Sequence, residues 1–311
     1  MSNLTLRILT AVVAIPLIVA ICLAGGIYFL GFVAIVSAAA LSEFYTLAKA
    51  KGANPQVVLG IFSGFLINLS FYHIQLQIFV TGLFIDRGIA IPFPSQAQLL
   101  FIILLMSVAV MSLVELYRNE GSALLNLSTT LLGILYISLF FGTFIGLREV
   151  FTPLDPPVFR YFVNTIGSGD AEVIYRAGGY TVISIFALIW ICDSAAFHFG
   201  VAMGKHKLFP RVSPNKSWEG AIFGFVFAIG SAVAAKYLVL DYLSLGNVIV
   251  IGIIVGVFGQ LGDLIESLLK RDAGVKDSSN LIPGHGGVFD RFDSLLLVSP
   301  LVYFYLDFIV F

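Results

Sequence analysis

Long runs of hydrophobic residues without a charged side chain dominate the chain, for example Ile8–Ser42, Gly52–Ile85 and Tyr242–Gly262. A helix needs about 20 apolar residues to cross about 30 Å of hydrocarbon, whereas a membrane β-barrel shows short alternating segments. The pattern therefore predicts an all-α fold, a polytopic transmembrane helical bundle of about nine spans. The expected spans lie near 5–24, 27–48, 56–73, 98–117, 122–147, 178–202, 218–240, 246–270 and 291–311.

The composition supports this class. Of the 311 residues, 59% are hydrophobic and 11% are charged, whereas soluble domains carry about 25% charged residues. This excludes a soluble enzyme, a disordered chain and a disulfide scaffold. The formal net charge of −1 predicts no acidic macromolecular partner and no nucleic acid. The two cysteines, Cys22 and Cys192, lie in apolar runs and are expected to be unreactive.

The distribution of Lys and Arg predicts the orientation. With the N-terminus in the cytoplasm, most of the 17 basic residues fall in inner loops, as the positive-inside rule requires. Residues 72–97 are expected to form an external or re-entrant segment. Residues 148–177, rich in Pro and Gly, are expected to form an external loop insertion. Two regions are predicted: an N-terminal scaffold, 1–177, and a C-terminal catalytic region, 178–311.

Four polar residues in the eighth predicted span share one helical face, since Asp263, Glu266, Ser267 and Lys270 follow i, i+3, i+4, i+7 spacing. Ionisable groups at membrane depth normally face a bundle interior or a wet cavity. Two interpretations remain open at this point. The face belongs to a functional site, or Lys270 forms an internal salt bridge with Asp263 or Glu266.

The segment after this span, residues 270–294, carries further candidate chemistry. Lys270, Arg271 and Lys276 are cations suited to phosphate, and glycines at 284, 286 and 287 allow backbone N–H groups to approach an anion. Asp290 and Asp293 are three residues apart, and with Asp263 they form the oxygen-rich cluster that Mg²⁺ prefers. The alternative is a solvated basic loop.

A second basic loop, residues 204–220, contains Lys205, Lys207, Arg211 and Lys216. It is either a further phosphate-binding element or an anchor for anionic lipid headgroups. Asp193, an isolated acid inside the sixth predicted span, is a weaker site candidate.

Two segments resemble a known family. The pattern Ser267-x-x-Lys270-Arg271-x4-Lys276-Asp277, followed by His285-Gly286-Gly287-x-x-Asp290-Arg291-x-Asp293, resembles the signature of phosphatidate cytidylyltransferase (CDP-diacylglycerol synthase). The stretches G-K-H-K-L and S-P-N-K-S-W-E-G, the latter starting at Ser213, are similar to a second region typical of this family. Asn215-Lys216-Ser217 departs from the Lys-Lys-Thr that members often carry. The resemblance is specific across residues 190–311.

The resemblance implies that the protein condenses CTP with phosphatidate to give CDP-diacylglycerol and pyrophosphate. It implies a homodimer that needs Mg²⁺, alone or aided by a monovalent cation such as K⁺, in a bacterial inner membrane with the site facing the cytoplasm. The expected catalytic residues are Asp263, Lys270, Arg271, Asp290 and Asp293, with the metal on Asp263, Asp290 and Asp293. The expected substrate-binding residues are Asp193, Lys205, Lys207, Arg211, Ser213, Lys216, Lys276, His285, Gly286, Gly287 and Arg291.

Two other functions are weighed against this one. A transporter also uses carboxylates inside the membrane, but it gives no reason for the adjacent Gly, Lys and Arg residues of phosphate type. A CDP-alcohol phosphatidyltransferase shares the lipid and the metal, but its D-G-x-x-A-R…G-x-x-x-D-x-x-x-D pattern is absent from this sequence.

Overall fold

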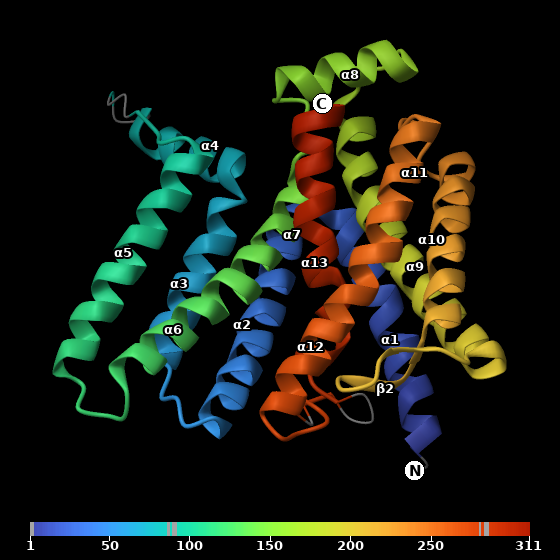
Figure 1. Ribbon diagram of the computed structural model, residues 1–311. Coiled ribbons are helices and arrows are strands. Elements are labelled where there is room, and N and C mark those ends of the chain that lie inside the picture. The colour runs from blue at the N-terminus through green and yellow to red at the C-terminus, as the bar shows by residue number, and fades with distance from the viewer. Residues whose placement is uncertain (1–2, 86–87, 89–91, 280, 283–285) are drawn as a thin grey trace. The chain divides into compact units, whose positions relative to one another are not determined.

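The computed structural model describes residues 3–85, 88, 92–279, 281–282 and 286–311, with side chains from residue 11 onward. Almost all of this chain is helical (Figure 1). The first half contains α1 (Asn3–Ala24), α2 (Gly26–Ala50), α3 (Val57–Ser70), α4 (His73–Ile85), α5 (Gln96–Tyr117), α6 (Ala123–Gly133), the π-helical η1 (Ile134–Ser138) and α7 (Leu139–Glu149).

The second half contains a short hairpin among its helices. Its elements are α8 (Pro156–Ile166), α9 (Ala171–Met203), β1 (Lys207–Phe209), β2 (Ser213–Ser217), α10 (Trp218–Leu238), α11 (Leu245–Ile254), η2 (Val255–Gly259), α12 (Gln260–Asp272), α13 (Phe289–Tyr305) and η3 (Leu306–Val310). The strands β1 and β2 pair antiparallel, with Lys207 opposite Ser217.

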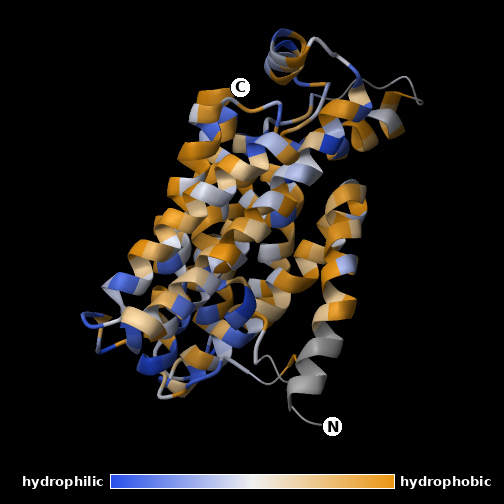
Figure 2. Cartoon of the chain, turned by 90° about the vertical axis from the view of Figure 1, so that its right-hand side faces the viewer, coloured by the Kyte–Doolittle hydropathy of each residue, from blue (hydrophilic) through white to orange (hydrophobic). Residues whose placement is uncertain are grey.

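The all-α polytopic class is confirmed. Among the described residues, seven helical runs are long and apolar enough to span a membrane. The pair α3 and α4, bent by 87°, is a broken span or a re-entrant segment, and Ala11–Ala24 of α1 is a shorter apolar helix. The predicted count of about nine is therefore approximate, although each predicted span coincides with a helix. Figure 2 shows hydrophobic residues along the helices and hydrophilic residues concentrated near their ends.

The chain forms two compact units. The smaller, Gly26–Gly146, is held together by a buried polar network around Glu115, which accepts hydrogen bonds from Gln56 Nε2 and Asn126 Nδ2, each at 2.7 Å. The larger unit comprises Met1–Gly25 and Leu147–Phe311. This larger unit contains the whole predicted catalytic region, together with α1, the end of α7, and α8.

The expectation of a loop over 148–177 is wrong for part of that stretch, because α8 occupies its middle. Pro156 is at the start of α8, where a backbone N–H would have no partner within the helix, so proline is tolerated there. Gly167 ends the helix in a left-handed conformation (φ 71°). Val158 and Phe162, one turn apart, are fully buried. The Phe162 ring stacks on Tyr242 at 5.5 Å between centroids. In Figure 1, α8 lies across the end of the bundle at which α13 ends.

Glycines allow the helices of the larger unit to approach closely. A Cβ on Gly220 of α10 would lie 2.6 Å from the Ala196 carbonyl oxygen of α9. A Cβ on Gly262 of α12 would lie 2.5 Å from the Asp293 carbonyl oxygen of α13. Real Cβ atoms do not approach this closely, so each crossing requires glycine. The second crossing brings together the two helices that carry the candidate metal ligands.

Candidate active site

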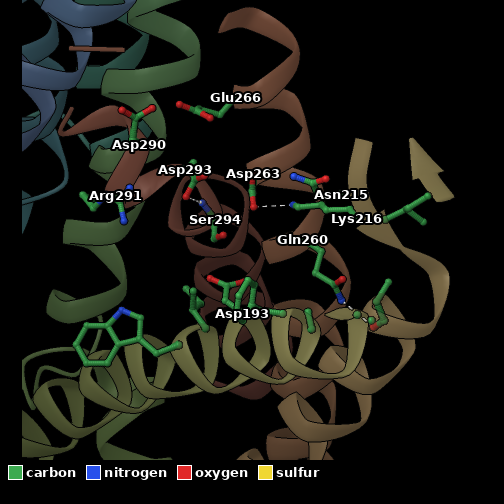
Figure 3. Close-up of a pocket in the computed structure, with 18 of the residues that line it drawn as sticks. Asp193, Asn215, Lys216, Gln260, Asp263, Glu266, Asp290, Arg291, Asp293 and Ser294 are labelled. Carbon is green, nitrogen blue, oxygen red and sulfur yellow. Dashed lines mark hydrogen bonds and ion pairs between the residues drawn. The ribbon is translucent and has the colours of Figure 1, made fainter. Parts of the chain in front are cut away.

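A cavity of about 500 Å³ lies within the larger unit (Figure 3). It is lined by residues of α9, β1, β2, α10, α12 and α13 and by Asp277. The hairpin reaches it through Lys216, and the base of the hairpin is fixed by a contact of 2.6 Å between His206 Nδ1 and Glu219 Oε1. The cavity therefore combines a hairpin with four helices that belong to candidate membrane spans.

Three carboxylates converge in this cavity. Asp263 and Glu266 of α12 and Asp293 of α13 each place one oxygen so that all three lie within 4.8 Å of one another. Glu266 is 1% exposed, and its Oε1 atom has no hydrogen-bond partner among the residues that the structure describes. Buried carboxylate oxygens normally have a donor or a cation beside them. The three carboxylates form the kind of oxygen donor set that hard cations prefer.

Gln260 fixes the helix segment that carries this cluster. Its Nε2 atom donates to the carbonyl of Gly256, at 2.6 Å, and to the carbonyl of Ala221 in α10, at 3.1 Å. Gly256 belongs to the π-helical turn η2, and such turns are frequent at functional sites. Gln260, which lies one helical turn before Asp263, thus joins η2 to α10. This connection restricts the movement of the helix segment that carries the carboxylates.

Lys216 is a basic residue in contact with the Asp263 end of the carboxylate cluster. Its Nζ atom lies 2.6 Å from Asp263 Oδ2, and the two side chains are 29% and 34% exposed. Figure 3 shows Lys216 reaching Asp263 from β2, and Asp193 on the neighbouring helix α9. The Lys216 ammonium therefore lies where a bound cation would also lie.

Lys270 and Asp290 form a second ionic group. The Lys270 Nζ atom lies 2.7 Å from Glu266 Oε2 and 2.7 Å from Asp290 Oδ1. The predicted alternative of an internal salt bridge between Glu266 and Lys270 is therefore present, and it coexists with the carboxylate cluster.

Asp290 also organises the loop that precedes α13. Its carboxylate accepts hydrogen bonds from the backbone N–H groups of Gly287, at 2.8 Å, and Ser278, at 3.1 Å. Gly286 has a φ of 83°, and a Cβ there would lie 2.8 Å from Asp290 Oδ2. The Gly287 N–H group, expected to face a phosphate, thus binds Asp290.

The structure brings part of the predicted site together. Seven of the predicted site residues line the cavity: Asp193, Lys216, Asp263, Lys270, Asp290, Arg291 and Asp293. The lining does not include Lys205, Lys207, Arg211, Ser213, Arg271, Lys276, Gly286 or Gly287. Arg271 instead donates to the Val275 carbonyl at 3.0 Å. His285 lies outside the described residues.

Gln260 lines the cavity although no sequence motif predicts it, and Glu266 lines it although it is not among the expected catalytic, metal-binding or substrate-binding residues. Glu266 carried a detectable signal, because it stands one turn after Asp263 on the polar face of the same helix. A glutamine without a motif gives no comparable signal.

The cavity is negatively charged overall. Its lining has six carboxylates, those of Asp193, Asp263, Glu266, Asp277, Asp290 and Asp293. Three basic side chains, those of Lys216, Lys270 and Arg291, face them. Polyphosphates bind where positive charge predominates. A cavity with this lining can therefore hold a polyanion only together with added cations.

Comparison with known proteins identifies similar chains. A family model described as "Cytidylyltransferase family" matches residues 5–309. The phosphatidate cytidylyltransferase of Staphylococcus haemolyticus (strain JCSC1435) is 31% identical over 296 residues, which cover 95% of this chain and 96% of that protein. The enzyme of the same name from Staphylococcus aureus (strain COL) is 32% identical over 297 residues, with the same coverage.

Proposed function

The chain belongs to the cytidylyltransferase family, and we propose that it is a phosphatidate cytidylyltransferase embedded in the membrane. In the reaction, a phosphate oxygen of phosphatidate attacks the α-phosphorus of CTP. The new P–O bond gives CDP-diacylglycerol, and the bond to the β-phosphate breaks to release pyrophosphate. The carboxylate cluster of Asp263, Glu266 and Asp293, inside an apolar helical bundle, is the observation that carries this proposal.

We propose that Mg²⁺ binds at this cluster. The buried Glu266 carboxylate and the two neighbouring aspartates fit a hard cation, and Asp290 is engaged instead with Lys270 and the loop. Mg²⁺ bound there supplies charge neutralisation for the triphosphate and the leaving pyrophosphate. A monovalent cation such as K⁺ would lower the remaining negative charge of the cavity further.

The side chains of this protein bind and orient the substrates. A phosphate monoester has a second pKa of about 6, so phosphatidate is largely dianionic at neutral pH and needs no strong general base. Lys216 and Arg291 face the cavity and can each donate to a phosphate oxygen. Lys270, between Glu266 and Asp290, holds α12 and the start of α13 together. Catalysis thus depends mainly on positioning and charge neutralisation.

We further propose that the cavity opens to the cytoplasm of a bacterial cell and that the enzyme is a homodimer. The cytoplasmic orientation is supported by the basic residues of the hairpin and of the segment after α12, and by the cytosolic location of CTP. The bacterial inner membrane is supported by the staphylococcal source of the relatives. The homodimer rests on the family resemblance alone.

The decisive experiment uses purified protein, radiolabelled CTP, phosphatidate and MgCl₂, and measures the CTP-derived label in the lipid fraction. We expect a liponucleotide that depends on phosphatidate and on Mg²⁺. Asp263→Asn should lower turnover by orders of magnitude. Asp272→Asn, at an exposed position on the same helix outside the cavity lining, is the matched control and should leave it unchanged. If no labelled lipid forms with phosphatidate and Mg²⁺ present, the proposed function is wrong.

A further inference from the structure

A second cavity of about 440 Å³ lies along α9. We call it the α9 groove. Its lining includes Ala187, Trp190, Ile191, Ser194 and His198 of α9 and Phe227 of α10. Except for Ser194 and His198, its lining side chains are apolar. The groove belongs to the larger unit and lies along a helix long and apolar enough to span the membrane.

Trp190 lines both the α9 groove and the active-site cavity. Consecutive residues of an α-helix lie about 100° apart around its axis. Asp193 faces the active-site cavity and Ser194 faces the groove, so the two hollows occupy neighbouring faces of α9. Trp190, one turn earlier, lies between these faces. The two cavities therefore meet at one side chain.

The active-site cavity also has an apolar rim beside Trp190. Phe197 and Val201 line this cavity and are 67% and 75% exposed, and Trp190 is 44% exposed. Large apolar side chains exposed on a membrane-spanning helix contact lipid chains. The carboxylates and lysines thus occupy one part of the cavity, and the rim next to the groove contacts hydrocarbon.

We propose that the α9 groove binds an acyl chain of the lipid substrate, which leaves the active-site cavity over Trp190. This inference rests on the proposed function, since that function requires a lipid phosphate at the carboxylates while its chains remain in hydrocarbon. A chain that leaves the charged part of the cavity over Trp190 enters the groove directly. Ser194 and His198 supply the groove's polar side chains, suited to the ester groups of a lipid.

The groove acts by positioning the lipid. The surrounding bilayer is itself apolar, so transfer of an acyl chain from the bilayer into the groove gains no hydrophobic free energy. Binding in the groove therefore depends on van der Waals packing of the chain against the groove wall. A chain seated in the groove orients the phosphate that it carries toward the carboxylates. The groove should therefore affect long-chain phosphatidate and not CTP.

The test uses Ser194→Phe, which fills the groove from an exposed position. Val226→Phe, on an exposed position of α10 outside the lining of both cavities, is the matched control. Kinetics are measured with dioleoyl-phosphatidate and with dibutanoyl-phosphatidate, whose four-carbon acyl chains are much shorter than the oleoyl chains. We expect Ser194→Phe to raise KM several-fold for the dioleoyl substrate only, with KM for CTP unchanged. Val226→Phe should change none of these values.

Other outcomes would overturn the proposal. Equal effects of Ser194→Phe on both lipids, or no effect on either, would show that the groove holds no chain. Loss of the oligomer on size exclusion, with both lipids affected, would make the groove an interface between copies of this chain. A wild-type protein that converts neither lipid would refute the proposed function itself and not the groove.

A second measurement needs no variant. A phosphatidate with a diazirine in its acyl chain is photolysed in the wild-type protein, and the labelled peptides are mapped by mass spectrometry. We expect labelling of 187–198 that an excess of dioleoyl-phosphatidate suppresses. Labelling that is not saturable, or saturable labelling elsewhere only, would contradict the proposal.

Discussion

Replacement of Lys216 by methionine should change metal affinity and substrate affinity in opposite directions. The Lys216 ammonium lies 2.6 Å from Asp263 Oδ2, and Asp263 belongs to the carboxylate cluster. A cation that binds at the cluster must compete with this ammonium for the same carboxylate. Methionine is one atom shorter than lysine and keeps most of its apolar stem but carries no charge, so it removes the competitor with a small change in volume.

The magnitudes follow from the exposure of the pair. An ion pair whose members are about a third exposed contributes at most about 1 kcal/mol, so the metal should bind up to about fivefold more tightly in Lys216→Met. A charge-assisted hydrogen bond to a phosphate contributes roughly 1.5–3 kcal/mol. Its loss should raise KM for one of the two substrates by roughly 10- to 150-fold.

The assay combines two measurements on the same preparation. Mn²⁺, which prefers the same oxygen ligands as Mg²⁺, is titrated without nucleotide and followed by electron paramagnetic resonance, and KM is then measured for each substrate. Lys49→Met, an exposed lysine outside the cavity lining, is the control and should change neither quantity. If Lys216→Met weakens Mn²⁺ binding, or leaves Mn²⁺ affinity and both KM values unchanged, the competition argument is wrong.

Three further predictions concern the helix crossing, the metal ligand and the topology. Gly262→Ala should separate α12 from α13, destabilise the protein by about 1–3 kcal/mol in thermal unfolding and lower turnover. Gly230→Ala, where a Cβ meets open space, should do neither. Asp293→Asn should lower turnover by orders of magnitude and weaken the dependence of turnover on Mg²⁺. A lower melting temperature with normal turnover of the folded fraction would contradict a role for Asp293 as a metal ligand. In intact cells, Lys207→Cys should react with an impermeant thiol reagent only from the cytoplasm and Asp241→Cys only from outside.

The helices were predictable because each residue of a long apolar run adds to the same hydropathy signal. A run of about 20 apolar residues has few structures available in a membrane, so α2, α5 and α9 fall where the hydropathy places them. The helix α8 was missed because prolines and glycines were interpreted as loop residues. Pro156 begins that helix and Gly167 ends it, and the spacing of Val158 and Phe162 was the signal that could have revealed it.

The residues of the site were predictable only in part, because they come from different helices and the packing of those helices decides which of them come together. The i, i+3 spacing places Asp263 and Glu266 on one face, but spacing alone does not tell which acid of α13 comes within 4.8 Å. That choice depends on the crossing at Gly262, where α12 meets the backbone of Asp293. In the same way, pairing of β1 with β2 brings Lys216 to the cavity and leaves Lys207 exposed.

Asp290 and Asp293 belong to one short motif but have different roles. Asp293 lies in the cluster, while Asp290 accepts hydrogen bonds from Lys270, Gly287 and Ser278. Three donors occupy most of the roughly four acceptor sites of this carboxylate, which leaves little room for a metal at Asp290. Lys270 also contacts Glu266, so Asp290 acts on the cluster through this lysine. The same aspartate therefore couples the loop before α13 to the orientation of the buried Glu266 carboxylate.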